Sequence, residues 1–144
     1  MTNYRKGSHT IFQCTYHIVW IPKYRYPILT GQVALRLREL VRQIAGANEV
    51  DILSGNVGSD HIHLHVSIPP HLSVSNFVQF VKGATSRKIQ MEFEDIRKRY
   101  WGQHIWARGY FVATSGAVTM DMIQEYIRKQ DVNDHDDEFK ITNV

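Results

Sequence analysis

The sequence Asp60-His61-Ile62-His63-Leu64-His65-Val66-Ser67-Ile68-Pro69-Pro70 alternates strictly between polar and apolar side chains from His61 to Ile68. Successive side chains of a β-strand point to opposite faces of its sheet, so the alternation predicts a strand with one apolar face toward a core. The imidazoles of His61, His63 and His65 would share the other face. The prolines end the strand, because proline cannot donate to a ladder. Paired histidines on a sheet surface can hold a divalent metal ion, and the chain would then have to supply a third ligand and a nucleophile.

The composition is that of one globular domain. A chain of 144 residues is long enough for one sizeable core and short for two. A single cysteine, Cys14, excludes an internal disulfide and fits a reducing compartment. No apolar run approaches the roughly 18 residues of a membrane span, and the first ten residues lack a secretory apolar region. We therefore expect a cytoplasmic protein.

Charge is distributed unevenly along the chain. Residues 131–144 carry five acidic side chains against Lys140 alone, whereas the preceding 130 residues carry 16 basic against 9 acidic side chains. A basic body of this kind favours a polyanionic partner, although many ordinary proteins share it. We predict a single domain over residues 1–133 and an acidic, flexible tail over residues 134–144.

Periodicity and capping residues predict the order strand, helix, strand, strand, helix, strand, helix, which is a split βαβ layout with one extra helix. Thr30, Ser73 and Thr119 are expected to begin the helices. Lys82-Gly83 is expected to break the second helix, since glycine within a helix costs about 1 kcal/mol. The predicted strands cover residues 11–21, 49–57, 61–68 and 105–114, and the helices cover residues 30–47, 73–100 in two pieces, and 119 to about 130.

The last predicted helix carries a candidate nucleophile and a candidate ligand. Tyr126 and Gln130 are four residues apart, so they lie one turn apart on the same face. Glutamine can provide a neutral oxygen to a two-histidine metal site, and a tyrosine beside that metal could attack a phosphate. The resulting phosphotyrosine ester would retain the cleaved linkage for strand transfer. Tyr126 also shares an apolar stripe with Ile123 and Ile127, so core packing alone would explain it.

Several short motifs of the chain resemble those of a known family. His61-Ile62-His63 resembles the HUH motif, and Tyr126-Ile127-Arg128-Lys129-Gln130 resembles the helix of the single-tyrosine transposases of small insertion sequences, the IS200/IS605 class. Three further stretches are typical of that class, and the resemblance extends from about Thr10 to Gln130. These stretches are Ile21-Pro22-Lys23-Tyr24-Arg25, Val81-Lys82-Gly83 and Trp106-Ala107-Arg108-Gly109-Tyr110.

The resemblance implies an α+β fold, with a ferredoxin-like antiparallel sheet, helices on one face and an extra C-terminal helix that carries the nucleophile. It implies a homodimer with joined sheets, in which Tyr126 is often delivered in trans. His61, His63 and Gln130 would hold Mg²⁺ or Mn²⁺. The substrates would be single-stranded DNA hairpins at the element ends and single-stranded target DNA. Cleavage would leave a 5′-phosphotyrosine and a free 3′-hydroxyl, and rejoining would follow.

His65 departs from the family pattern, where an apolar residue is common. Parity alone allows either His61/His63 or His63/His65 as the working pair, and Asp60 before the motif favours the first. Basic residues near the family motifs are expected to contact DNA phosphates. The tyrosines of residues 23–27 are available for stacking on bases, but a solvated loop whose tyrosines cap the core explains the same pattern and is favoured by that pattern alone. The predicted DNA-binding residues are Arg5, Lys6, Lys23, Arg25, Lys82, Arg87 and Arg108.

Three other functions compete with transposition. A non-catalytic module that binds single-stranded nucleic acid can use the same sheet layout, but it usually presents aromatic rather than histidine side chains on the exposed face. A replication or host-adopted HUH nickase would share the chemistry. A two-histidine phosphoesterase needs two His-x-Ser/Thr motifs, and the chain has only His65-Val66-Ser67.

Overall fold

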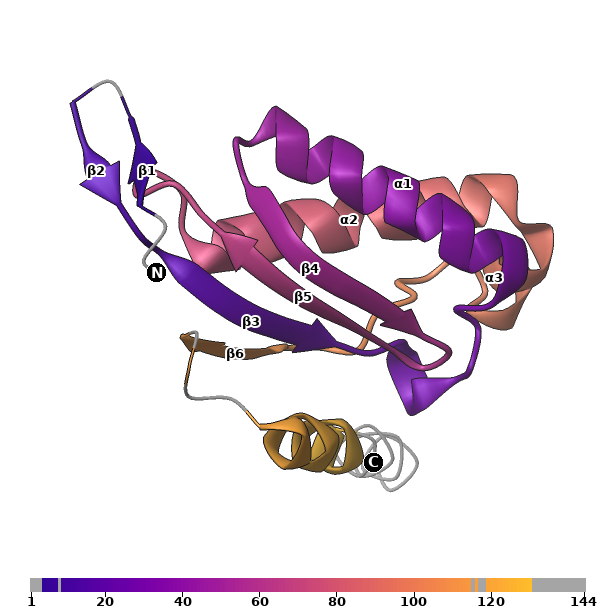
Figure 1. Ribbon diagram of the computed structural model, residues 1–144. Coiled ribbons are helices and arrows are strands. Elements are labelled where there is room, and N and C mark those ends of the chain that lie inside the picture. Colours follow the sequence, from indigo (N-terminus) through magenta and orange to yellow (C-terminus); the bar gives the residue numbers. More distant parts are fainter. Residues whose placement is uncertain (1–3, 8, 115, 117–118, 131–144) are drawn as a thin grey trace, which may run out of the picture.

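The computed structural model describes residues 4–7, 9–114, 116 and 119–130. It contains a two-stranded and a four-stranded sheet with helices packed on both sides of the larger one (Figure 1). The strands are β1 (Arg5–Lys6), β2 (Ile11–Phe12), β3 (Thr15–Trp20), β4 (Asp51–Gly58), β5 (His61–Ser67) and β6 (Phe111–Thr114). The helices are η1 (Lys23–Arg25), α1 (Gly31–Ala47), α2 (Val74–Glu92), α3 (Glu94–Arg99) and a helical segment over residues 120–130.

The larger sheet has the strand order β4-β5-β3-β6, and every neighbouring pair is antiparallel. The strands β4 and β5 form a hairpin around Ser59 and Asp60, as the sequence predicts. Because β5 lies between β4 and β3, the histidine strand is internal to the sheet. This order confirms the expected ferredoxin-like α+β fold.

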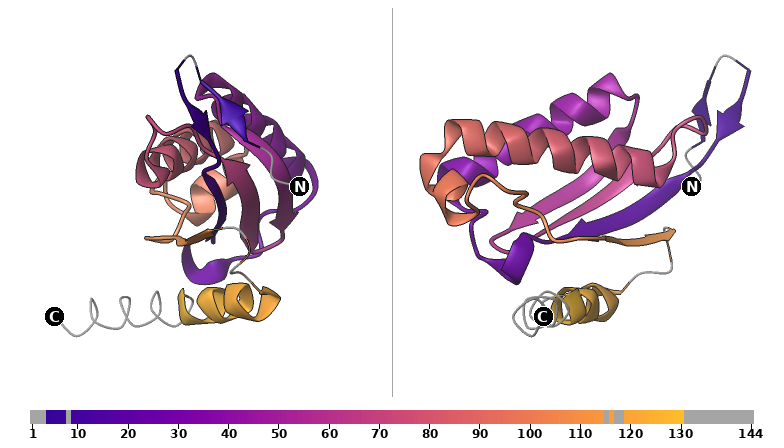
Figure 2. Two further views of the ribbon diagram at one scale, coloured as in Figure 1. Left: turned by 60° about the vertical axis from the view of Figure 1, so that its left-hand side comes forward. Right: turned by 180° about the vertical axis from the view of Figure 1, so that it is seen from behind.

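One face of the sheet builds the main core with α1 and α2 (Figure 2). Ile62, Leu64 and Val66 of β5 are buried there, as their alternation with histidine predicts. Phe77 of α2 and Leu37 of α1 are fully buried against them. Truncation of such a residue to alanine costs about 2–5 kcal/mol of folding free energy.

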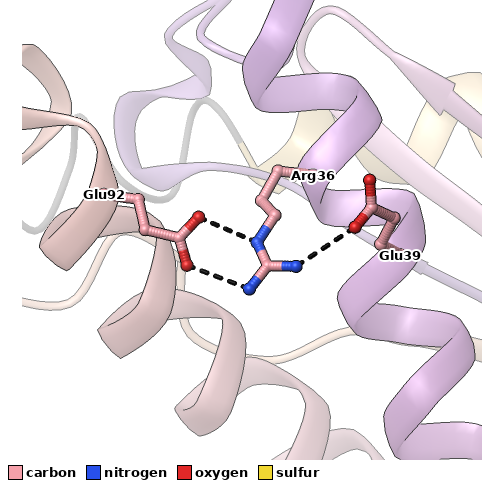
Figure 3. A network of polar contacts seen from close by, with 3 residues as sticks. All are labelled: Arg36, Glu39 and Glu92. Atoms are coloured by element: carbon pink, nitrogen blue, oxygen red, sulfur yellow. Dashed lines mark hydrogen bonds and ion pairs between the residues drawn. The ribbon is translucent and has the colours of Figure 1, made fainter.

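An arginine links the two long helices beside this core (Figure 3). Arg36 of α1 donates through Nε and Nη2 to the two carboxylate oxygens of Glu92 at the end of α2, at 2.8 and 3.0 Å. Its Nη1 atom donates to Glu39 one turn along α1, at 3.2 Å. The planar guanidinium suits this two-point contact, so Arg36 connects α1 to the end of α2 through an ion pair.

The opposite face of the sheet is covered by the helical segment of residues 120–130, which lies across the sheet from α1 and α2 (Figure 1). Ile123 and Ile127 are buried against Val19 and Ile21 of the β3 region. Thr119 accepts a hydrogen bond from the Met122 amide at 3.3 Å, so the predicted cap is confirmed. The extra C-terminal helix therefore packs on the histidine face.

Several predicted boundaries are wrong at the N-terminal strand and in the second helix. The expected strand 11–21 is interrupted, because β2 pairs with β1 and the Cys14 carbonyl instead accepts from Ile68. The second helix does not break at Gly83, because α2 runs through it to Glu92 with buried residues on both sides. The break falls at Phe93, whose backbone is extended.

The last predicted strand is also shorter than expected. Residues 105–110 make only one bridge to the sheet, between Trp106 and Pro22, and β6 begins at Phe111. The indole of Trp106 instead donates to Thr85 of α2 at 3.0 Å, and the Ile105 amide donates to Ser86. Side-chain contacts with α2 therefore replace a ladder. The predicted strand 49–57 is shifted to Asp51–Gly58.

No helix among the described residues is long and apolar enough to cross a membrane. The predicted domain boundary at residue 133 and the acidic tail of residues 134–144 lie outside the described residues.

Candidate active site

The three histidines of β5 lie on the sheet face opposite the main core, as the alternation predicts. His61, His63 and His65 are each half-buried, whereas the residues between them are buried. Cross-strand neighbours on β3 are Val19 for His63 and His17 for His65. The histidine row is therefore flanked by an apolar position and by a fourth imidazole.

His61 is held by a chain of polar contacts that starts at Arg25. The Arg25 Nε atom lies 3.1 Å from one carboxylate oxygen of Asp60, and the other oxygen lies 3.0 Å from His61 Nδ1. With Nδ1 donating to this carboxylate, the Nε2 atom of His61 keeps its lone pair. A metal-binding histidine commonly has this outer carboxylate, which fixes the tautomer and the ring orientation.

Gly58 leaves the space that the His61 ring occupies. A Cβ atom at this position would lie 2.4 Å from Cε1 and 2.8 Å from Nδ1 of His61. Any side chain at residue 58 would therefore push the imidazole away from its place beside Asp60.

His17 is a site residue that the sequence analysis does not single out. Its Nδ1 atom lies 2.9 Å from Nε2 of His63, and its ring stacks on that of His65 with centroids 4.2 Å apart and an interplanar angle of 3°. The sequence offers one indication of this role: alternation along the predicted strand 11–21 places His17 on the polar face of the sheet. The register that puts β3 beside β5 is a tertiary feature that parity does not give.

Burial and neighbouring imidazoles lower the pKa of two histidines in this cluster. Desolvation, followed by the nearby His65, lowers the pKa of His17. Desolvation, followed by the other three imidazoles, lowers the pKa of His63. Neutral imidazole is the form that binds a metal ion, so the environment favours ligand chemistry over charge.

Tyr126 lies on the same face of the sheet as the histidines. Its ring packs 5.8 Å from that of Phe111, and it joins the small core formed by Val19, Ile21 and Ile127. Its hydroxyl is shielded from solvent in this arrangement. The core packing expected for this residue is therefore present, and the core lies on the histidine face. The role of Tyr126 as a nucleophile stays a prediction.

Gln130 is anchored at the end of the same helical segment. Its Nε2 atom donates to the Arg108 carbonyl at 2.8 Å, which leaves Oε1 as the amide atom that could contact a cation. Within the described part of the chain, no group of three His, Cys, Asp or Glu side chains is arranged to hold a metal ion. A site based on His61 and His63 would thus need an amide, water or substrate oxygen as a further ligand, and oxygen ligands of this kind are the ones that Mg²⁺ and Mn²⁺ prefer.

Three of the predicted DNA-binding residues have structural contacts. Arg5 binds the carbonyls of Ser67 and Glu49 at 2.9 and 2.7 Å. Lys82 donates to the carbonyls of Ala107 and Gly109 at 2.8 and 2.7 Å. Arg25, as described above, binds Asp60.

Three of the other four predicted DNA-binding residues are more accessible. Lys6, Arg87 and Arg108 are exposed, and Lys23 is half-buried with its ammonium 5.4 Å from the Tyr24 ring. Their contact with DNA stays a prediction.

The fold and the comparisons with known proteins together define a DNA-processing enzyme of the transposase class. The chain belongs to the family described as "Transposase IS200 like", which it matches over residues 10–130. It is 34% identical over 126 residues to the ISDra2 transposase TnpA of Deinococcus radiodurans, covering 88% of this chain and 90% of that protein. It is 37% identical over 123 residues to the transposase for insertion sequence element IS200 of Salmonella typhimurium, covering 85% and 80%.

A solved structure supports the fold. The crystal structure of a Deinococcus radiodurans protein assigned as a transposase superposes with a TM-score of 0.80 at 32% sequence identity. The superposition covers 88% of this chain and 97% of that one.

Proposed function

We propose that this transposase cleaves and rejoins single-stranded DNA through a covalent bond to Tyr126. The observation that carries the proposal is the shared face: the Tyr126 helix packs on the side of the sheet where Asp60 and Gly58 place the His61 imidazole. A phosphate bound beside the histidines could be approached by a tyrosine of this helix. We place the reaction in the cytoplasm.

The reaction we propose has two balanced steps. The Tyr126 oxygen attacks phosphorus, the phenol loses its proton, and the bond from phosphorus to the 3′-oxygen breaks. The leaving strand gains a proton and ends in a 3′-hydroxyl, while the other strand carries the 5′-phosphotyrosine. In the second step a 3′-hydroxyl loses its proton and attacks the same phosphorus, the bond from phosphorus to the Tyr126 oxygen breaks, and the phenol regains a proton. The two strands are joined without an external energy source.

His61, His63 and the Gln130 amide oxygen are the residues we propose as ligands of Mg²⁺ or Mn²⁺. When bound, the ion would polarise the scissile phosphate and stabilise the charge that develops on it. The protein's own contribution is to hold the His61 ring through Asp60 and Arg25, and to lower the pKa of His17 and His63, mainly by burial. Hairpin-shaped element ends and a homodimer with shared sites are further parts of this proposal.

The test is a covalent adduct assay with a labelled single-stranded hairpin from the gene's own flanks. With Mg²⁺ or Mn²⁺ we expect a protein–DNA adduct that survives denaturation. Tyr126→Phe should abolish it, while Tyr4→Phe, which changes an exposed tyrosine (62% accessible), should not. An undiminished adduct in Tyr126→Phe would show that another residue is the nucleophile.

A second variant separates cleavage from binding. His63→Ala should lose cleavage and keep hairpin binding, because phosphate and base contacts lie elsewhere. A wild-type protein that binds the hairpin equally with and without divalent ions, and gives no adduct, would instead be a binding module.

A further inference from the structure

His17 and His65 form a stacked pair directly behind the candidate ligand His63. The two rings are nearly parallel, at 3° and 4.2 Å between centroids, and they lie opposite each other on adjacent strands. From this stack, His17 points its Nδ1 atom at Nε2 of His63, at 2.9 Å. Two contacts of different kinds therefore meet in the His17 ring.

We propose that His17 and His65 are positioning residues, in which His65 fixes the His17 ring by stacking and His17 fixes the tautomer and orientation of His63. The expected effect on metal binding rests on the metal site proposed above. The expected effect on the His63 tautomer rests on the contact alone. It gives His65 a task other than that of a third metal ligand.

The chemistry of two imidazoles explains how such a contact selects a tautomer. In a neutral pair one ring nitrogen must donate and the other must accept, so the 2.9 Å contact couples the tautomers of the two rings. Only the arrangement in which His63 Nε2 donates to His17 Nδ1 leaves the lone pair of His63 Nδ1 for a metal ion, and this is the arrangement that the proposal requires. Outer partners of this kind orient a metal-binding histidine, and their loss typically lowers metal affinity about 10–100-fold. His61 already has such a partner in Asp60, and His17 is the corresponding partner of His63.

The stack explains why His17 can hold this position. A side chain on a β-strand keeps rotational freedom unless neighbours restrict it, and a flat ring 4.2 Å away restricts it strongly. Any ring at residue 65 would serve for stacking, whereas the polar contact at residue 17 needs a nitrogen or oxygen beside Cγ. Two sets of variants can therefore separate the two contributions.

The first measurement is the ring ¹⁵N spectrum of His63 in metal-free, DNA-free protein. We expect one tautomer in the wild type and a mixture in His17→Phe, which keeps a ring but loses Nδ1. His17→Asn places an amide atom near the lost Nδ1 and should restore most of the single tautomer. An unchanged His63 spectrum in His17→Phe would overturn the proposal, and this result does not depend on whether the protein cleaves DNA.

The second measurement is Mn²⁺ affinity, followed by electron paramagnetic resonance. His17→Phe should lower it about tenfold, while His17→Asn should recover most of the loss. His65→Phe should stay near wild type and His65→Ala should fall below it. Dispersed amide spectra for each variant would show that the fold is intact.

A direct ligand role gives a different result. If Mg²⁺ shifts the His17 ring nitrogens as strongly as those of His61 and His63, His17 is itself a ligand and the positioning role is wrong. If all four variants bind Mn²⁺ with the affinity of the wild type, neither His17 nor His65 contributes to metal binding.

Discussion

The site depends on single atoms around each imidazole. His61 is placed by a carboxylate on one side and by the missing side chain of Gly58 on the other. The first of these could be anticipated, since Asp60 is next to His61 in the sequence. The second could not, because the approach of Gly58 arises only when the hairpin pairs Gly58 with His61.

Gly58→Ala should therefore damage the site without unfolding the protein. The new Cβ would lie 2.4 Å from His61 Cε1, and the movable imidazole would give way more readily than the backbone. We expect Mn²⁺ affinity to fall about tenfold, as for loss of an outer partner, with a nearly unchanged melting temperature.

The matched control is Gly46→Ala in α1, where nothing lies within 4 Å of the new methyl group. It should leave Mn²⁺ affinity unchanged. Equal affinities in wild type and Gly58→Ala would show that the His61 position is unimportant for binding the ion.

Acid should destabilise the protein through the same cluster. The pKa values of His17 and His63 are lowered in the fold, first by desolvation and then by neighbouring imidazoles. Below pH 6.5 the imidazoles of the unfolded chain therefore bind protons, while those of the folded chain stay unprotonated. The free energy of unfolding decreases as the pH is lowered, until the pH reaches the lowered pKa values of the folded state. We expect a lower melting temperature at pH 5.5 than at pH 7.5.

His17→Asn is the variant that tests this assignment. It removes one titrating imidazole and one neighbour of His63, so the difference in melting temperature between the two pH values should shrink. A difference as large as that of the wild type would assign the acid sensitivity to other groups.

At the scale of elements, local pattern predicts the buried faces better than the boundaries. The periodic stripe of residues 74–81 predicts the buried Phe77, Val78 and Val81, and the alternation of β5 predicts its two faces. By contrast, the ends of α2 and β6 are set by tertiary contacts. Trp106 hydrogen-bonds to α2 instead of extending β6, and a pattern of apolar residues does not distinguish these outcomes.

Gly83 shows the same limit and gives a stability prediction. It lies within α2 without a break, it is exposed, and nothing lies within 4 Å of a methyl group built on it. Gly83→Ala should therefore raise the free energy of unfolding by about 0.5–1 kcal/mol, because alanine loses less backbone entropy in a helix. Urea denaturation followed by circular dichroism would measure it.

The same variant should be assayed for hairpin binding. A more stable protein with weaker binding would indicate that DNA approaches the helix closely at Gly83. A destabilised protein would contradict the prediction and point to a close contact that the fold requires.

At the scale of the whole molecule, the question is which subunit supplies the tyrosine. Within one chain, the Tyr126 hydroxyl is shielded beside Phe111 and the Gln130 amide is bound to the Arg108 carbonyl. Movement of the helix, or a helix from a second copy, must therefore bring a phenol to the phosphate. The homodimer with shared sites that we propose would supply the tyrosine from the second copy. A sequence cannot reveal the answer, because both arrangements use the same residues.

Two inactive variants with different tags, produced together, distinguish these arrangements. In a mixed dimer of Tyr126→Phe and His63→Ala, exchange of helices joins intact histidines of one subunit to the intact tyrosine of the other. We expect an adduct in the mixture, and it should be attached only to the His63→Ala subunit, since that subunit alone retains Tyr126. The matched control pairs His63→Ala with the double variant His63→Ala/Tyr126→Phe, which has no His63 in either subunit and should give no adduct. Absence of an adduct from purified mixed dimers would mean that each helix serves its own sheet, and the packing of Tyr126 against Phe111 would then be the resting position from which it moves.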